Sequence, residues 1–231
     1  MKTLLIIPWP NDPIPGLPEG VDCKALNDGV PLRGYVDVAR NEHLFLDAVV
    51  QAEKDGYGAV VSLCFADTGI ENARKMVNIP VLGCTRVGMH LACILGHKVC
   101  VLQPDYELNA NTTRSIIDVY NMGSFAKLVN PHVDSLTIFN DVQQAAASGK
   151  AGDAIQKCVD AIIRSLEEDG TDVVVFGSGA LAGAEDILHA ELSKRGYEVP
   201  VVNGLSAAIG FAQVLNGLQL SQSRTGYPWG A

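Results

Sequence analysis

A cysteine and a serine stand at matching places in two similar stretches of the sequence. Cys64 follows the apolar run of "GAVVSLCFADTG" (58–69), and Ser178 follows that of "DVVVFGSGALAG" (172–183). If each run is a strand of a parallel sheet, both side chains lie at a carboxyl end, where such sheets bind ligands. At a helix N-terminus the dipole favours a thiolate, so we expect the pKa of Cys64 to be lowered. Two such groups facing one carbon could remove a proton from one side and return it from the other, which is racemisation without a cofactor.

The glycines of the second stretch also allow another interpretation, a dinucleotide-binding loop. Gly177, Gly179 and Gly183 approach the spacing of that fingerprint. A dinucleotide loop follows the first strand of its unit, and the next strand ends in an acid. Here the turn follows the third strand of its half, and the next strand ends in Asn203. The position of the turn therefore argues against a dinucleotide, and we expect no cofactor.

The elements that position these residues alternate between short apolar runs and longer amphipathic stretches, which is typical of parallel α/β folds. We expect strands at 3–8, 21–26, 58–64, 79–83, 98–102, 134–139, 172–177 and 199–203. We expect helices at 39–55, 69–77, 86–95, 107–121, 151–168, 184–195 and 205–217.

The same order of strands and helices occurs twice along the chain, which indicates an internal repeat of about 110 residues. Asp55-Gly56 and Asp169-Gly170 each end a helix and lie 114 residues apart, and the same offset places Cys64 on Ser178. We therefore expect an α/β protein with two pseudo-symmetric flavodoxin-like halves. Each half is a four-stranded parallel sheet flanked by helices, and the active site lies in the cleft between the halves.

The predicted halves are residues 1–95, completed by 205–231, and residues 96–204. A chain of 231 residues with 48% hydrophobic residues can fill two such cores. The net charge of −9 and the lack of a basic patch argue against a nucleic-acid partner. No apolar run reaches the ~18 residues of a membrane span, and the first residues lack a signal-peptide pattern. We expect a cytoplasmic protein without membrane contact.

The six cysteines fit that location as free thiols. The absence of a C-x-x-C pair argues against a structural zinc site, so we expect no metal. We expect Cys64 to be the reactive thiol and the first to be alkylated. The other five should be packing residues or bystanders: Cys23, Cys84, Cys93, Cys100 and Cys158.

Four motifs follow one another along the chain: "CFADTG" (64–69), "VFGSGALAG" (175–183), "VPVVNGLSAAI" (199–209) and "SRTGYPWG" (223–230). In the same order they are similar to C-F-G-D-P-G, V-L-G-C-A-G-M-A, P-V-I-D-G-V-S-A-A and a closing S-K-x-G-x-Y-x-x-P. These are motifs of the aspartate/glutamate/hydantoin racemase superfamily, which the chain resembles over nearly its whole length, and of its hydantoin and allantoin racemase branch in particular. The resemblance implies a cofactor-independent isomerase of the racemase or epimerase type. Its substrate would carry an acidic C–H beside a carboxylate or carbonyl.

The family's two catalytic residues are cysteines, and Ser178 departs from this pattern. Cys64 matches the first cysteine and Ser178 the second. Serine is a poor base because its hydroxyl is far less acidic than a thiol. Three interpretations follow: a cysteine replaced in order to trap a ligand, a natural lyase or decarboxylase with one thiol, as in the arylmalonate decarboxylases, or a protein that binds a small carboxylate without turnover.

The remaining candidates for substrate binding follow the strand ends or the same motifs. They are Asn11, Phe65, Asp67, Thr85, Arg86, Gly177, Gly179 and Ser206, with Gln103 and Tyr106 as further possibilities. Arg86 stands where the branch tends to have an acid, and its guanidinium favours a carboxylate on the substrate. Asp67, Ser178 and Ser206 also fit a structural role as helix caps. The expected partners are a small carboxylate or carbonyl substrate and further copies of the chain in a homo-oligomer.

Overall fold

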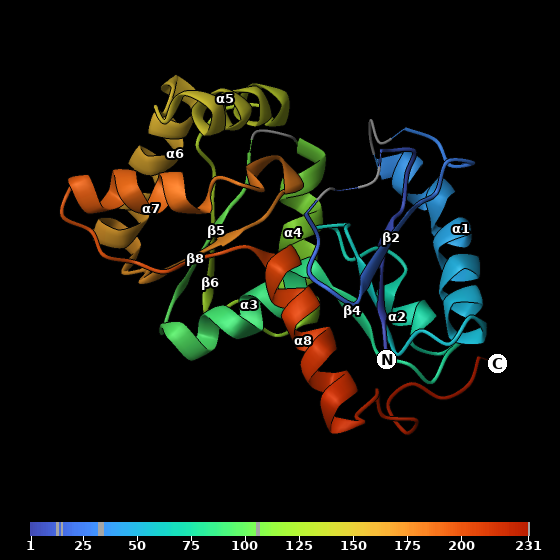
Figure 1. Ribbon diagram of the computed structural model, residues 1–231. Helices are drawn as coiled ribbons and strands as arrows, with labels where there is room; N and C mark the ends of the chain where they lie inside the picture. The colour runs from blue at the N-terminus through green and yellow to red at the C-terminus, as the bar shows by residue number, and fades with distance from the viewer. Residues whose placement is uncertain (13, 15, 32–34, 105–106, 231) are drawn as a thin grey trace. The chain divides into compact units, whose positions relative to one another are not determined.

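The computed structural model describes residues 1–12, 14, 16–31, 35–104 and 107–230. The chain forms two compact units, one of Met1–Val87 and Leu205–Ala231, the other of Gly88–Gly204. Each unit contains a sheet of four parallel strands with helices beside it (Figure 1). The predicted α/β class and its two four-stranded parallel sheets are therefore confirmed. The division between the units falls inside helix α3 (Cys84–Leu95).

The first unit has the strand order β2-β1-β3-β4, which is the flavodoxin-like order. Its strands are β1 (Thr3–Ile7), β2 (Val21–Ala25), β3 (Ala59–Ser62) and β4 (Val81–Gly83), and its helices are α1 (Tyr35–Lys54), α2 (Ile70–Ala73) and most of α8 (Gly204–Leu218). All four residues of β3 are buried, as expected of a strand covered on both faces.

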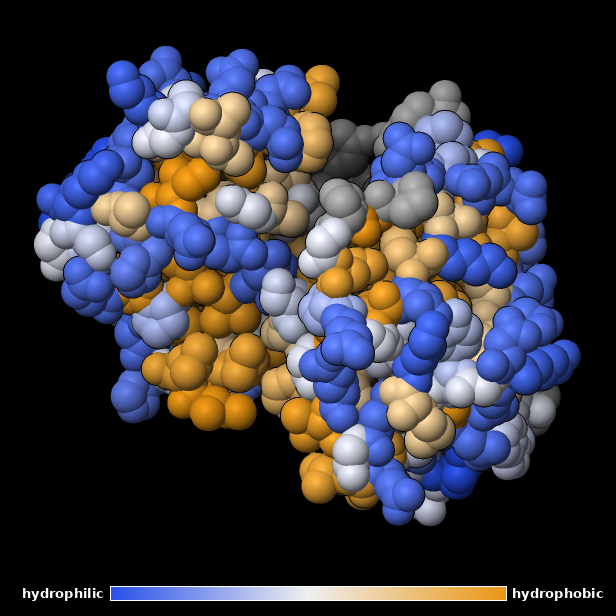
Figure 2. Space-filling view, in the orientation of Figure 1, coloured by the Kyte–Doolittle hydropathy of each residue, from blue (hydrophilic) through white to orange (hydrophobic). Residues whose placement is uncertain are grey.

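Helix α1 covers this sheet with one apolar face. Phe45, Val49 and Ala52 recur at helical spacing and are at most 1% exposed, in one core cluster with Ile6 and Val60. The outer face of α1 is polar, and Figure 2 shows hydrophilic residues predominating over this helix. The helix therefore fixes the position of its buried residues relative to β3.

The second unit has the corresponding order β6-β5-β7-β8. Its strands are β5 (Val99–Leu102), β6 (Ala126–Val129), β7 (Val173–Phe176) and β8 (Val201–Val202). Its helices are α4 (Glu107–Val119), α5 (Ser135–Ser148), α6 (Asp153–Arg164) and α7 (Glu185–Lys194), with a π-helical turn (Ser165–Asp169) and a 3₁₀ turn (Gly179–Leu181).

The common strand order is what an internal repeat predicts, and local geometry agrees with it. Gly56 and Gly170, at the predicted offset, follow the long helical segments of the two units and have φ of 84° and 69°. This left-handed conformation is the usual one for a glycine just after a helix, because it carries no Cβ.

Two predicted elements differ from the structure. The strand predicted at 134–139 is wrong, because these residues begin helix α5, and the fourth strand is β6 instead. Asp134 starts that helix by accepting hydrogen bonds from the backbone N–H groups of Leu136 and Thr137. The helix predicted at 69–77 is only the four residues of α2. No helix in the described residues is long and apolar enough to cross a membrane.

Candidate active site

Cys64 lies two residues beyond the carboxyl end of β3, in the loop that leads to α2. Its backbone N–H donates to Ser62 Oγ at 3.3 Å, and its carbonyl accepts from the N–H of Asp67 at 3.0 Å. Asp67 has a left-handed φ of 48°, which makes the loop turn back sharply. The side chain of Cys64 is buried, and its Sγ lies 3.6 Å from Thr68 Oγ1 within hydrogen-bonding contact.

The junction between β4 and α3 holds this loop in place. Thr85 Oγ1 donates to the carbonyl of Phe65 at 2.6 Å. The buried Asp67 carboxylate accepts from the backbone N–H groups of Thr85 at 3.2 Å and Arg86 at 2.9 Å. A carboxylate there satisfies unpaired N–H groups and complements the helix dipole. Asp67 therefore caps α3 and not α2, and the predicted cap near Gly69 is wrong.

The acidity expected for Cys64 is not what its surroundings produce. Burial raises the pKa of the Cys64 thiol, and the Thr68 hydroxyl and the backbone N–H groups of Thr68 and Ala66 lower it again. The nearby charge of Asp67 raises the pKa further. The predicted lowering is wrong because α2 begins only at Ile70 and is a single turn, too short and too distant to supply a strong dipole.

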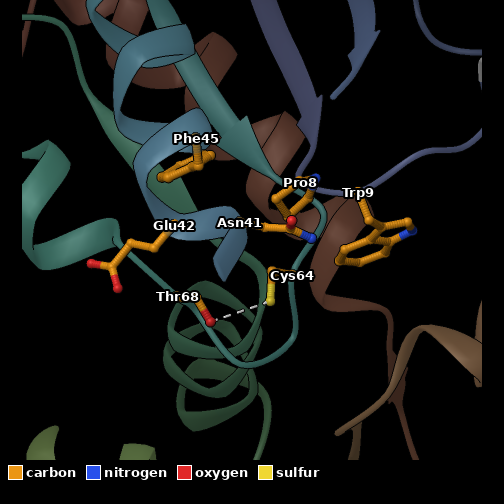
Figure 3. Close-up of a pocket in the computed structure, with 7 residues that line it drawn as sticks. All are labelled: Pro8, Trp9, Asn41, Glu42, Phe45, Cys64 and Thr68. Atoms are coloured by element: carbon orange, nitrogen blue, oxygen red, sulfur yellow. Dashed lines mark hydrogen bonds between the residues drawn. The ribbon is translucent and has the colours of Figure 1, made fainter. Parts of the chain in front are cut away.

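A pocket in the first unit reaches the Cys64 sulfur (Figure 3). Its lining consists of Pro8, Trp9, Asn41, Glu42, Phe45, Cys64 and Thr68. The Asn41 amide shapes one wall, because it is held by the backbone of Val30 through bonds of 2.8 and 2.7 Å. Glu42 Oε1 is occupied by the side chain of Asn72 at 2.9 Å. The pocket thus offers mainly apolar and aromatic contact around one thiol and one hydroxyl.

Sequence reasoning missed most of this lining. Asn41, Glu42 and Phe45 belong to α1 and precede Cys64 by about twenty residues, so no local motif connects them with it. Trp9 lies two residues after the end of β1. Because β1 pairs with β3, and neighbouring parallel strands end at the same edge of the sheet, the sequence could have indicated that Trp9 lies near Cys64.

Ser178 occupies the corresponding place in the second unit, after β7. It is the N-cap of the 3₁₀ turn, with its Oγ accepting from the N–H of Ala180 at 3.3 Å, so the predicted capping role is confirmed. Gly179 is the first residue of that turn. At Gly177 a Cβ would lie 2.6 Å from Gln103 Oε1 and 3.1 Å from the carbonyl of Leu102, so a larger residue there would have to displace the Gln103 amide.

Gln103 is therefore a neighbour of the Ser178 turn. It is 1% exposed, its Oε1 accepts from Thr113 Oγ1 at 2.9 Å, and its Nε2 has no partner. Tyr106, proposed with it as a ligand contact, lies outside the described residues.

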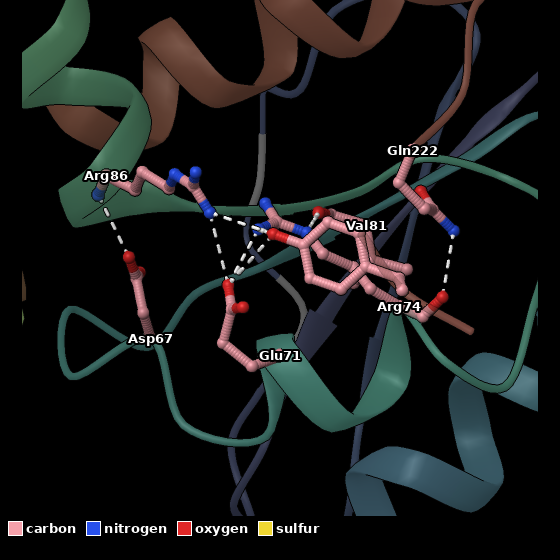
Figure 4. A network of polar contacts seen from close by, with 7 residues as sticks. Asp67, Glu71, Arg74, Val81, Arg86 and Gln222 are labelled. Carbon is pink, nitrogen blue, oxygen red and sulfur yellow. Dashed lines mark hydrogen bonds and ion pairs between the residues drawn. The ribbon is translucent and has the colours of Figure 1, made fainter. Parts of the chain in front are cut away.

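Arg86 lies in a polar network of the first unit (Figure 4). Its Nη1 is 3.1 Å from Glu71 Oε1 and 3.2 Å from the Tyr227 hydroxyl. Arg74 Nη1 contacts the same two groups at 2.8 and 3.0 Å. A substrate carboxylate at Arg86 would have to compete with Glu71. Ion pairs as exposed as this one are worth about 0–1 kcal/mol, so such competition is feasible.

The structure also places two further candidates, Asn11 and Ser206, and two further thiols, Cys84 and Cys93. Asn11 is exposed and donates to the carbonyl of Asp12. Ser206 is exposed inside the first turn of α8, so it is not the cap of that helix. Cys84 is buried with its Sγ donating to the carbonyl of Ser62 at 3.0 Å, as a bystander would be. Cys93 is exposed, so its predicted packing role is wrong, and reagents reach it more easily than Cys64.

Within the described residues, no group of three His, Cys, Asp or Glu side chains is arranged to hold a metal ion. The reactive groups that the described residues provide are a buried thiol beside a hydroxyl in the first unit and a capping serine in the second.

Comparison with known proteins identifies relatives with the same architecture. The family model described as Asp/Glu/Hydantoin racemase matches residues 27–212. A hydantoin racemase of Pseudomonas sp. (strain NS671) is 24% identical over 76% of this chain, and the match spans 66% of that protein, just under two thirds of its length.

Solved structures show the same fold. The allantoin racemase of Klebsiella pneumoniae has a TM-score of 0.77 at 22% identity, with 100% of this chain and 94% of that chain covered. A variant of arylmalonate decarboxylase has a TM-score of 0.56 at 17% identity, with 97% of each chain covered. The superfamily resemblance of the sequence is confirmed, and the chain belongs to the Asp/Glu/Hydantoin racemase family.

Proposed function

We propose that this protein is a cofactor-independent isomerase of the racemase or epimerase type, with Cys64 as its proton-transferring group. The observation that carries the proposal is the Cys64 sulfur in a pocket at the carboxyl end of β3, with a hydroxyl beside it. Membership of the racemase family supports the reaction class.

The proposed step is removal of a proton from a carbon next to a carbonyl or carboxylate. The Cys64 thiolate takes the proton, so the C–H bond breaks, an S–H bond forms, and the electron pair moves toward the carbonyl oxygen as an enolate. A thiol whose pKa is raised by burial is the stronger base once deprotonated, which suits a weakly acidic C–H. Return of a proton to the same face regenerates the substrate, and return to the other face inverts it.

Ser178 is proposed as the group that acts on the opposite face. Its hydroxyl can give or relay a proton but is a poor base at neutral pH. Proton removal from the Ser178 face should therefore be much slower than from the Cys64 face, so that isotope exchange on the Cys64 face is faster than net inversion.

For the substrate class we propose small molecules with an acidic C–H beside a carbonyl, of the hydantoin, allantoin or amino-acid type. The relatives named as hydantoin and allantoin racemases support this choice. The apolar and aromatic lining from Pro8, Trp9 and Phe45 suits a ring or an aliphatic side chain. Arg86 is proposed to attract a carboxylate where the substrate has one.

A lyase or decarboxylase that uses Cys64 alone is the second candidate. The serine at position 178 favours it, because one thiol suffices for replacing a leaving carboxylate by a proton on a single face. The arylmalonate decarboxylase fold is also shared, although likeness at this identity concerns the fold alone.

Incubation of single enantiomers from such a panel in deuterated water separates these functions. Deuterium at the stereocentre with racemisation supports the isomerase. Deuterated product with loss of carbon dioxide, or an eliminated product, supports the lyase. Binding without exchange would mean that the protein holds its ligand without turnover, and both enzymatic proposals would be wrong.

A further inference from the structure

The side chain that touches the Cys64 sulfur is one that the family motif does not contain. Where the branch reads C-F-G-D-P-G, this chain has "CFADTG", so Thr68 stands in place of a proline. Thr68 Oγ1 lies 3.6 Å from Sγ, and Figure 3 shows the hydroxyl pointing toward the sulfur inside the pocket. A proline offers neither a hydroxyl nor a backbone N–H, and Thr68 offers both.

The other groups around Cys64 do little to stabilise a negative charge on it. Asp67 and the Cys84 thiol act against the thiolate when they are charged, and Glu42 brings a further carboxylate to the pocket lining. The hydroxyl oxygen of Ser62 accepts a hydrogen bond from the backbone N–H of Cys64. The contacts that favour the thiolate come from Thr68 and from the backbone N–H of Ala66.

We propose that Thr68 is a positioning residue that keeps the Cys64 sulfur facing the pocket and stabilises its thiolate form. When the sulfur is ionised, the Thr68 hydroxyl donates to it. When the sulfur has taken a proton, the S–H donates to Thr68 Oγ1 after the hydroxyl has rotated. Thr68 keeps its own proton throughout, so the proton exchanged with the substrate stays on sulfur. This inference rests on the proposed function only in making Cys64 the base.

The test measures the thiol itself and needs no substrate. The rate at which iodoacetamide alkylates Cys64 is followed against pH by mass spectrometry of the Cys64 peptide, which separates it from the exposed Cys93. Thr68→Val, nearly the same shape without the hydroxyl, should move the midpoint upward by about one pH unit, so that alkylation below the midpoint is about tenfold slower. Thr68→Ser should restore a midpoint close to that of the parent protein.

A control variant deletes the hydroxyl of a buried threonine elsewhere in the chain. Thr171 is 4% exposed and its Oγ1 contacts Ser165 Oγ at 3.1 Å in the second unit, so Thr171→Val should leave the Cys64 profile unchanged. Thr68→Ala serves as a second hydroxyl deletion if the valine variant does not fold. An unchanged midpoint in the deletion that folds overturns the proposal, as does an equal shift in Thr68→Ser. Because no substrate is present, a parent protein without isotope exchange would refute the proposed function and leave this result standing.

Discussion

The hydroxyl of Thr85 donates a 2.6 Å hydrogen bond to the carbonyl of Phe65, the residue directly after Cys64. This bond connects the β4–α3 junction to the loop that carries the thiol. Both partners are buried, at 0% and 8% exposure, so water cannot replace either of them easily. The bond therefore fixes where the sulfur lies.

Thr85→Val should loosen the Cys64 loop. The carbonyl of Phe65 would lose its donor while remaining buried, which costs about 1–3 kcal/mol of folding free energy. Urea denaturation measures the loss, and the exchange rate should fall with it. Thr85→Ser keeps the donor and should recover most of both quantities. Equal stability of the valine variant and the parent protein would show that the bond does not hold the loop.

Removal of the Asp67 charge should lower both the pKa of Cys64 and the stability of the protein. Asp67→Asn takes away a negative charge that raises the pKa of Cys64, so the alkylation midpoint should move down by a fraction of a pH unit. The same change turns an amide N–H₂ toward a backbone N–H at the start of α3 and should cost about 1 kcal/mol of stability. Asp47→Asn, on the exposed face of α1, removes an equal charge and should do neither. An upward midpoint shift in Asp67→Asn would contradict this electrostatic account.

The strands and helices that could be predicted from the sequence are those with a clear pattern in their own residues. Strands β3 and β7 are continuous buried runs bounded by turn residues, so their places and the thiol and hydroxyl after them could be predicted. Strand β6 is half exposed and carries Lys127, so its sequence pattern is weak. The more apolar "DSLTIF" was therefore predicted as the strand in its place. Asp134, three residues before Thr137, was the available signal that this stretch starts a helix.

The lining of the pocket could not be predicted from local sequence patterns. Phe45 and Asn41 have the spacing of buried positions on α1, which predicts that they face the sheet but not which part of it. Their meeting with Cys64 depends on the tertiary packing of α1 against the sheet. The burial that raises the thiol pKa is likewise a sum over distant segments, so the expected sign was wrong.

Alkaline pH should destabilise the protein through its buried thiols. Burial raises the pKa of Cys100 to about 12, whereas an unfolded cysteine ionises near ~8.5. Between these values only the unfolded state releases the proton. Stability that is complete below ~8.5 is therefore lost as the pH rises, by about 1.4 kcal/mol per pH unit for each such thiol.

Cys100→Ala isolates one of these contributions. The variant should be less stable than the parent protein at neutral pH because it loses packing, but its stability should fall less steeply above ~8.5. Urea denaturation series at several pH values give both slopes. Parallel slopes for the two proteins would show that Cys100 does not contribute to the alkaline loss.

If the protein is a racemase, Ser178→Cys should allow proton removal from the Ser178 face as well as from the Cys64 face. A thiol at this position can act as a base where the hydroxyl cannot, and acid–base assistance is typically worth ~10²–10⁴-fold. Exchange from the slower enantiomer should therefore rise, as followed by chiral chromatography and isotope analysis. Ser178→Ala is the companion variant and should abolish inversion while leaving exchange on the Cys64 face. A Ser178→Cys protein with unchanged one-sided exchange would favour the single-thiol lyase.

The most direct measurement compares parent protein and Cys64→Ser for deuterium incorporation at the stereocentre of a substrate identified in the panel, by proton NMR. With Cys64 as the base, the parent protein should incorporate deuterium and Cys64→Ser should be slower by at least about 10²-fold, with its melting temperature unchanged. Retention of the full exchange rate by folded Cys64→Ser would contradict the central claim that this thiol transfers the proton.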